Sequence, residues 1–261
     1  MVNSIRLFIF ISIFFCFASG CSAYEIEPYS RQAIFDVEAP VILSLVFCPL
    51  DYQKHEAFLE DIDTIIERLH KTRPFDEFVG RIEFYYISLS KEEENMIFKR
   101  TQNFPFLKVR RDFLDSILAD INSKYKLIII DALGSVSCAE LSLKDKMSLV
   151  ILGRRRYKNK SSFAKGFLHE LGHSLGLRDE CVDCERLCPH GEPNCAATKA
   201  DAEKWWGDLV GKVKFVNYIK GCCGNKNYIR PTIASLMNDP DKAEDFGSVN
   251  ERYLREMLER L

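Results

Sequence analysis

The sequence predicts an α/β or α+β fold, in which helices back a mostly parallel, twisted sheet. Three observations support this class. Short apolar, β-branched runs alternate with amphipathic helical patterns through the first two thirds of the chain. Six of the ten cysteines lie in the last third, where apolar periodicity is weak. Apolar residues return at helical spacing only at the C-terminal end, so an irregular, cysteine-rich C-terminal part should end in a helix.

Each expected element follows from its apolar pattern. Uninterrupted or alternating apolar residues predict strands over residues 41–48, 81–89, 127–130 and 149–152. Apolar residues three and four apart predict helices over 54–72, 113–121, 161–176 and 248–261. Pro49 is expected to end the first strand, and residues 132–147 to supply an edge strand. Residues 91–106 show no clear period, and the chain after Asp179 is expected to stay irregular until the last helix.

The most informative stretch, residues 169–179, reads HELGHSLGLRD. His169 and His173 lie four apart on the expected helix, so both imidazoles can reach one ion. Glu170 follows the first of them, where its carboxylate can take a proton from water at that ion. Gly176 allows the chain to leave the helix through a left-handed conformation. Asp179 can then fold back as a third ligand, which leaves a fourth position open, as in catalytic zinc sites.

Other interpretations of this stretch remain open. A helix with two surface histidines and a capping glycine would need no metal. Apolar residues at helical spacing on both sides of the motif favour instead a helix packed on a core. The third ligand could also be Glu180, His190 or, on a later helix, Glu203, although Gly176 favours Asp179.

The pattern HExxHxxGxxD resembles the signature of the metzincin metalloproteases. An Asp as third ligand is most similar to the immunoglobulin A peptidase-like family, and also to the small secreted snapalysins. Met237, within residues 235–238, resembles the methionine turn that lies beneath the metal in metzincins. Residues 179–180, 205–207 and 228–231 also resemble the immunoglobulin A peptidase-like pattern. The resemblance covers about residues 40–261, with strong motifs only from residue 162 onward.

This resemblance implies an exported zinc endopeptidase with one catalytic Zn²⁺, Glu170 as general base, and a protein or peptide substrate. It also implies one catalytic domain over residues 24–261, with subdomains of about 40–178 and 179–261. Tyr228 is a candidate for oxyanion or substrate binding, because no tyrosine directly follows Met237. Two other functions stay open. One is a catalytically silent cell-surface binding protein, which the intact Glu170 disfavours; the other is a zinc amidase acting on cell-wall amides.

Residues 1–23 are predicted to be a targeting segment. One charge, Arg6, precedes an apolar run over residues 7–18 that is short for a membrane span. Small residues follow, so cleavage after Gly20 or Ala23 and secretion are expected. The alternatives are lipidation of Cys21 or an uncleaved anchor. Only through such an anchor or lipid is the chain expected to contact a membrane.

The charge balance excludes one class of partner. A net charge of −2 argues against a nucleic-acid-binding surface. Residues 154–156 form a local run of three arginines, which is expected to be a solvated loop before the active-site helix rather than a substrate-recognition element. A monomer is expected.

Eight cysteines lie beyond the targeting segment, and an even number in an exported chain favours disulfides. They are Cys48, Cys138, Cys181, Cys184, Cys188, Cys195, Cys222 and Cys223. The neighbours Cys222 and Cys223 are expected to bond to different partners, because a bridge between them would be strained. A second, structural zinc is the alternative, with Cys181 and Cys184 joined by Cys188, His190 or Cys195.

Overall fold

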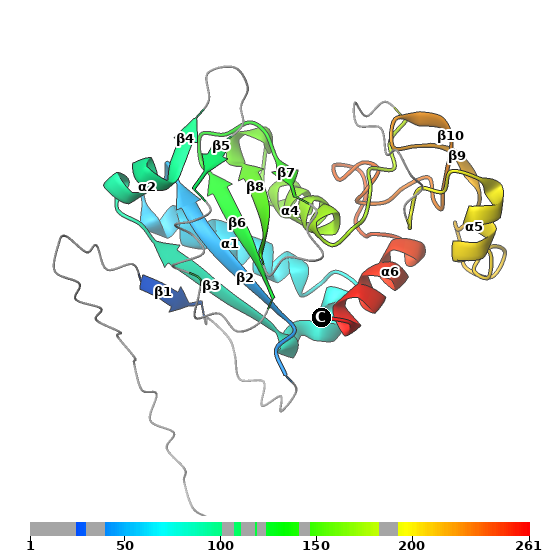
Figure 1. Cartoon of the computed structure of the whole chain (residues 1–261), viewed down its shortest axis with the longest axis horizontal. Helices are drawn as coiled ribbons and strands as arrows, with labels where there is room; N and C mark the ends of the chain where they lie inside the picture. The colour runs from blue at the N-terminus through cyan, green and yellow to red at the C-terminus, as the bar shows by residue number, and fades with distance from the viewer. Residues whose placement is uncertain are drawn as a thin grey trace, which may run out of the picture.

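The protein is an α/β structure with a mixed, mostly parallel sheet, as the sequence predicts (Figure 1). This computed structural model describes residues 25–29, 40–100, 107–110, 118, 124–140, 147–182 and 193–261. The predicted targeting segment and most of the predicted helix at 113–121 lie outside these residues. Among the described residues, none of the helices combines the length and the apolar character that a membrane crossing requires.

Six strands form the main sheet. Their spatial order is β1 (Glu25–Pro28), β3 (Ile82–Ser88), β2 (Leu43–Leu50), β6 (Tyr125–Asp131), β8 (Met147–Gly153) and β7 (Cys138–Ala139). The four inner strands are parallel, whereas β1 and β7 are antiparallel to their neighbours. The sequence predicted β2 as the first strand, but β1 precedes it in the chain. An edge strand was expected within residues 132–147, and β7 lies there.

All eight residues of β2 are buried, which is typical of a central parallel strand covered on both faces. Leu45 and Phe47 belong to the core cluster on one face, and Val46 and Cys48 to the cluster on the other. The expectation that Pro49 ends this strand is wrong. Pairing of β2 with β3 stops at Phe47, so proline, which has no N–H, lies where only β6 continues the ladder.

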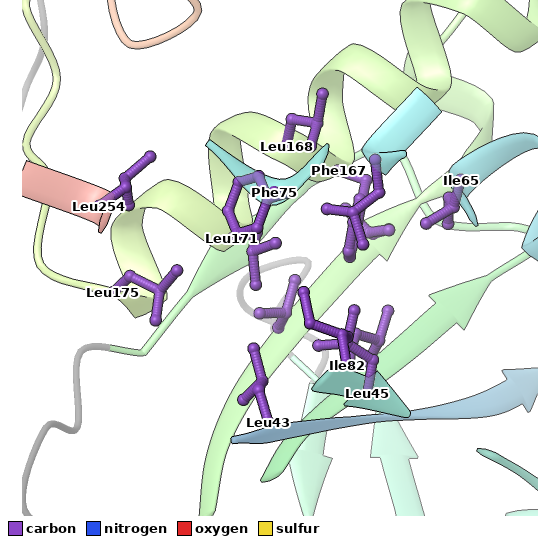
Figure 2. Packing of buried hydrophobic residues seen from close by; sticks show 14 of the residues in the cluster. Leu43, Leu45, Ile65, Phe75, Ile82, Phe167, Leu168, Leu171, Leu175 and Leu254 are labelled. Carbon is purple, nitrogen blue, oxygen red and sulfur yellow. The ribbon is translucent and has the colours of Figure 1, made fainter. Parts of the chain in front are cut away.

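Two helices cover one face of the sheet. They are α1 (His55–Leu69) and α4 (Lys160–Ser174). The apolar side chains of α1 that recur at helical spacing are fully buried, as predicted, except for Ile66, which is partly buried. Figure 2 shows Phe167 and Leu171 of α4 facing the sheet, where Leu43 and Leu45 of β2 meet them in the same core. Complete burial of each such side chain contributes about 1.5–3 kcal/mol. The helix with the two histidines is thus anchored along its length.

Regular structure also occurs where none was expected. Residues 91–100 form α2 (Lys91–Ile97) and β4 (Phe98–Arg100), which pairs with β5 (Leu107–Val109). Ser90 and Glu93 form a capping box at the start of α2. This Ser-x-x-Glu spacing was the available signal for the helix. The single-turn 3₁₀ helix η2 (Arg154–Arg156) and the longer η1 (Phe75–Arg81) complete this half.

The arginine run is only partly solvated, contrary to the expected loop. The guanidinium of Arg154 pairs with Asp61 of α1 at 3.0 Å and lies 4.7 Å from the centre of the Phe163 ring. Arg155 and Arg156 are exposed. Arg154 therefore ties η2 to both helices rather than to water.

The C-terminal part is more regular than expected. It contains α5 (Lys199–Trp206), the hairpin β9 (Ile219–Cys222) with β10 (Asn225–Arg230), and the closing helix α6 (Ser248–Glu259). Thr198 caps α5 by accepting a hydrogen bond from the N–H of Asp201. The hairpin turns through Cys223 and Gly224, both with positive φ, which suits a two-residue hairpin turn. Figure 1 shows α6 between the main sheet and the segment that contains α5 and the β9–β10 hairpin.

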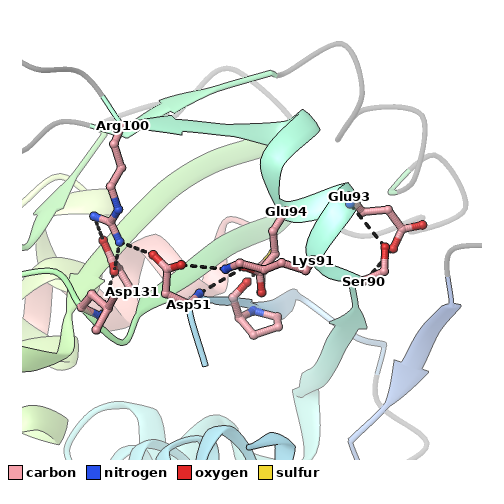
Figure 3. A network of polar contacts seen from close by, with 10 residues as sticks. Asp51, Ser90, Lys91, Glu93, Glu94, Arg100 and Asp131 are labelled. Carbon is pink, nitrogen blue, oxygen red and sulfur yellow. Dashed lines mark hydrogen bonds and ion pairs between the residues drawn. The ribbon is translucent and has the colours of Figure 1, made fainter. Parts of the chain in front are cut away.

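A charged network covers the carboxyl ends of the two central strands (Figure 3). Asp51 follows β2 and Asp131 ends β6. Arg100 donates two hydrogen bonds to Asp131, at 2.8 and 2.7 Å, and another to Asp51. Lys91 donates to Asp51 at 2.7 Å and to Glu94. The network holds α2 and β4 over this edge of the sheet.

Replacing Arg100 by alanine should destabilise the fold, because the Asp131 side chain, only 6% exposed, would lose its counter-charge. The Arg100 side chain is 48% exposed, so the loss should be about 1–2 kcal/mol rather than the larger penalty of a fully buried pair. Urea unfolding measures it. The exposed neighbour Lys99, replaced by alanine, should cost less than about 0.5 kcal/mol, and equal losses would contradict the role of Arg100.

Candidate metal centre

Helix α4 places two histidines side by side at its C-terminal end. Asn159 caps the other end in a capping box with Ser162, and the apolar face of the helix is buried against α1 and the sheet. His169 and His173 lie one turn apart, with ring centroids separated by 4.6 Å. The predicted helix is thus found, with His173 in its last turn and His169 one turn earlier.

Three electron-pair donors converge at this point. The Nε2 atoms of His169 and His173 are 3.1 Å apart, and each lies 3.3 Å from Oδ1 of Asp179. A tetrahedral ion with bonds of about 2.0–2.1 Å would separate its ligand atoms by about 3.3–3.4 Å, which these distances approach. Among the described residues, this is the one group of His, Cys, Asp and Glu side chains close enough to hold a metal.

The protonation of both imidazoles is set by backbone carbonyls. Nδ1–H of His169 donates to the carbonyl of Leu236 at 2.8 Å, and Nδ1–H of His173 donates to the carbonyl of Leu177 at 2.9 Å. A carbonyl only accepts, so Nδ1 carries the proton and Nε2 of the neutral ring keeps its lone pair. Both lone pairs of the neutral rings therefore face Asp179, an arrangement that is repulsive unless a proton or a metal cation lies among the three atoms.

The close approach of these side chains shifts the pKa values of Asp179 and His169. Burial would raise the pKa of Asp179, but hydrogen bonds to His169 and His173 outweigh it and hold that pKa well below its usual range. Burial would lower the pKa of His169, yet its contact with Asp179 raises it. Each residue thus favours positive charge at the centre, which suits a cation-binding site.

A left-handed turn at Gly176 (φ 110°) ends α4 and redirects the chain. The N–H of Leu177 donates to the carbonyl of Gly172, and the N–H of Gly176 donates to that of His173, both at 3.0 Å. These two bonds form a Schellman motif. A side chain at position 176 would also lie 2.4 Å from the Tyr253 hydroxyl. The turn aims the Leu177 carbonyl at His173 and brings the following chain back toward the ligands.

Sequence reasoning missed a lysine that supports the end of α4. Nζ of Lys126, on β6, donates at 3.0 Å to the carbonyl of Ser174, the last residue of the helix. The final carbonyls of a helix carry partial negative charge and lack partners within it, so a cation is favourable there. Burial lowers the pKa of Lys126 to about 8. In the sequence it stands one residue before the strand predicted at 127–130, so that strand appeared wholly apolar.

Glu170, the predicted general base, lies between the two histidines in the sequence and is 5% exposed. Burial raises the pKa of its carboxyl, and the neighbouring imidazoles oppose that shift. A carboxylate with a raised pKa accepts a proton more readily, which suits a base.

Glu180, one alternative for the third ligand, points into the core instead and is fully buried. Its Oε2 accepts a hydrogen bond from the Ser235 hydroxyl at 2.6 Å. Its Oε1 accepts from the side-chain amides of Asn194 at 3.1 Å and Asn250 at 2.8 Å. The carboxylate therefore joins three segments of the C-terminal part. It fixes the backbone next to Asp179, and so supplies the outer support that a metal-binding carboxylate needs.

Residues 235–238 form the tight turn expected at Met237. The N–H of Asn238 donates to the carbonyl of Ser235 at 3.0 Å, and Met237 is fully buried beneath α4. A side chain added at Gly172 would lie 2.7 Å from the Met237 sulfur, so the turn packs directly against the histidine helix. The preceding carbonyl, from Leu236, is the one that accepts from His169.

Disulfides fasten the segment around the third ligand. Cys195 and Cys222 are bonded to each other, with Cα atoms 5.7 Å apart, and Cys181 and Cys223 each take part in a disulfide as well. Cys222 and Cys223 thus have different partners, as expected. The N–H of Cys223 donates to the carbonyl of Asp179 at 2.9 Å. A cysteine in a disulfide cannot supply a thiolate ligand, so these bonds disfavour the alternative of a second, structural zinc.

Two of the eight cysteines expected in disulfides are thiols. Cys48 is enclosed within the central strand β2, and Cys138 lies on the edge strand β7, so the expectation is wrong for both. Burial raises the pKa of the Cys48 thiol well above its usual range. Residues 184 and 188 lie outside the described residues, as does His190.

The other two candidates lie on β10 and α5. Tyr228, on β10, packs against the cluster of Cys195, Cys222 and Cys223. Glu203 lies on α5, exposed, and pairs with Lys199 at 3.4 Å. Glu203 is therefore not part of the His169, His173 and Asp179 group.

The structure is similar to the crystal structure of archaemetzincin from Methanopyrus kandleri. The TM-score is 0.40 and the sequence identity 14%, with 84% of this chain and 97% of that chain covered. The sequence matches no family model and no curated protein. The assignment of the metal centre therefore rests on the residues and distances of this chain.

Glu180→Ala should weaken zinc binding by about 10–100-fold, because the backbone beside Asp179 would lose its buried anchor. Glu180→Gln should lose much less, since its oxygen can still accept from both asparagines while its amide donates to Ser235. Competition with a zinc-chelating dye measures both affinities. As a control, Glu203→Ala should bind zinc like the parent protein. Equal affinities of the alanine variant and the parent would contradict the support role.

Proposed function

We propose that this chain is an exported, zinc-dependent endopeptidase of metzincin type, most similar in its motif to the immunoglobulin A peptidase-like family. The observation that carries the proposal is the convergence of His169, His173 and Asp179 beside the buried carboxylate of Glu170. Two imidazoles and one carboxylate, with a fourth position left over, are the donor set of a catalytic rather than a structural zinc.

The donors of this site fit zinc. The orientation of both imidazoles by carbonyls and the depressed pKa of Asp179 leave three acceptors ready for a cation. Zinc held there would lower the pKa of water to near 7 and polarise the scissile carbonyl. Glu170 would accept the water proton and deliver it to the leaving amine. Asp179 would contribute negative charge, and His169 and His173 would each contribute an Nε2 lone pair.

The edge of the sheet offers a place for an extended substrate. Among the described strands β7 is one of the two edge strands of the sheet, and it contacts α4, the helix with the catalytic residues. The outer edge of such a strand presents backbone N–H and carbonyl groups that an extended peptide can pair with. This arrangement supports a polypeptide substrate.

Glu170→Ala should keep one zinc per chain yet cleave a protein substrate about 10²–10⁴-fold more slowly, because proton transfer is lost while the ligands stay in place. Zinc content by mass spectrometry and the rate of casein hydrolysis measure the two effects. Glu203→Ala is the matched control and should keep both. An alanine variant at Glu170 that cleaves at the parent rate would contradict the proposal.

Asp179→Ala should lose zinc, because two imidazoles alone hold it weakly. Dialysis against a chelator followed by metal analysis checks this. Retention of zinc by Asp179→Ala, with loss in Glu203→Ala, would show that a different ligand set is used.

The substrate class is tested on the zinc-loaded parent protein. If it cleaves no polypeptide but hydrolyses cell-wall amides, the proposed substrate class is wrong. If it cleaves neither, the silent binding protein is the better description.

A further inference from the structure

Asp179 is the one donor of the metal centre that does not lie on a helix, so its direction depends on how its backbone is held. Its carbonyl accepts the N–H of Cys223 at 2.9 Å. The N–H of the next residue, Glu180, donates to the carbonyl of Met237 at 2.8 Å, and the carbonyl of Glu180 accepts from the guanidinium of Arg230. These contacts hold the chain from Asp179 onward, so the direction of the donor also depends on what holds the residue before it.

The side chain of Asn194 holds that preceding residue. Its Oδ1 accepts the N–H of Arg178 at 2.9 Å, and its Nδ2 donates to the carbonyl of the same residue at 2.8 Å. Because a backbone N–H only donates and a carbonyl only accepts, these two partners fix the orientation of the amide. The side chain therefore pairs with Arg178 as a residue of a neighbouring antiparallel strand would.

The same amide also bonds to the residue on the other side of Asp179. Its Nδ2 donates to Oε1 of Glu180 at 3.1 Å. Asn194 is fully buried, and a buried amide that loses its partners is costly, so this side chain is not easily displaced. One asparagine thus connects the two neighbours of the third donor.

The segment that carries Asn194 is itself anchored. The next residue, Cys195, forms the disulfide with Cys222 at the end of β9. Ala196 exchanges two backbone hydrogen bonds with Ile229 of β10, both of 2.8 Å. The amide therefore extends from a segment that is cross-linked to the hairpin.

This support is relevant to metal binding because a ligand must be held within about 0.5 Å of its productive position. Oδ1 of Asp179 lies 3.3 Å from Nε2 of His169 and from Nε2 of His173. A rotation of the backbone at Arg178 would move the whole Asp179 side chain and lengthen both distances. The pairing of Asn194 with Arg178 opposes that rotation.

We propose that Asn194 is a positioning residue of the metal centre: its amide, paired with Arg178, sets the direction in which Asp179 presents its carboxylate to the metal. This inference rests on the zinc site of the proposed function but not on peptide cleavage. Metal binding therefore tests it separately from activity.

Asn194→Asp is the most informative variant, because aspartate has nearly the same size and still accepts the N–H of Arg178. It cannot donate to the carbonyl of Arg178 or to Glu180. Zinc should bind about tenfold or more weakly, as measured by competition with a zinc-chelating dye. Co²⁺ bound in place of zinc should show a changed visible spectrum, because its coordination geometry is altered. Asn227→Asp, at an exposed position of β10, is the matched control and should bind both metals like the parent protein.

Two further measurements separate positioning from other effects. Asn194→Asp places a second carboxylate beside Glu180, so the substitution is repeated in a Glu180→Gln background, where that repulsion is absent. It should still weaken zinc binding several-fold relative to Glu180→Gln alone. Urea unfolding with and without zinc extends the test to variants of low stability, because the stabilisation by zinc depends on its affinity for the folded chain. That stabilisation should be smaller in Asn194→Asp than in the parent protein.

An unchanged zinc affinity and Co²⁺ spectrum in Asn194→Asp would overturn the proposal and assign Asn194 to the stability of the fold alone. An effect that disappears in the Glu180→Gln background would also overturn it, because charge repulsion would then explain the loss. If the parent protein binds no zinc, the proposed function and this inference fail together. If the parent protein binds zinc but cleaves no polypeptide, only the proposed function fails.

Discussion

The rest of this structure depends on one constraint. Three electron-pair donors are held about as far apart as neighbouring ligand atoms in a tetrahedral metal site. His169, His173 and Asp179 bring two lone pairs and a carboxylate oxygen to within 3.1–3.3 Å of each other. Without a cation such an arrangement is repulsive, and it would relax if the side chains were loosely held. The protein prevents this by fixing each donor from outside, through carbonyls, a glycine turn, a disulfide and a buried carboxylate.

The supports come from parts of the chain that are far apart in the sequence. Lys126 on the sheet holds the end of α4, the methionine turn supplies the carbonyl for His169, and Glu180 ties Asp179 to α6 and to the disulfide-bonded segment. These hydrogen bonds hold the supporting segments in place, because opening one of them leaves a buried polar group unpaired. The C-terminal part therefore supports the candidate metal centre, although it contributes only one of the three donors.

The sequence predicted the elements whose information is local. The apolar period of α4, the spacing of its histidines and the need for a glycine after it were enough to place His169, Glu170, His173 and Asp179. Contacts between distant segments were not predictable, because neither periodicity nor motif spacing encodes them. Lys126 meets Ser174 across 48 positions and Glu180 meets Asn250 across 70, and both interactions were missed. The hairpin at Cys223 and the helix α5 were missed because the cysteine-rich composition suggested irregular structure.

X-ray absorption at the zinc edge of the purified protein tests the central claim most directly, because it reports the atoms bound to the metal. After dialysis, the account predicts one zinc per chain, bound to two imidazole nitrogens and to oxygen at about 2.0–2.2 Å. A spectrum dominated by sulfur at about 2.3 Å would assign the metal to the cysteines and contradict the account, as would a protein that retains no zinc.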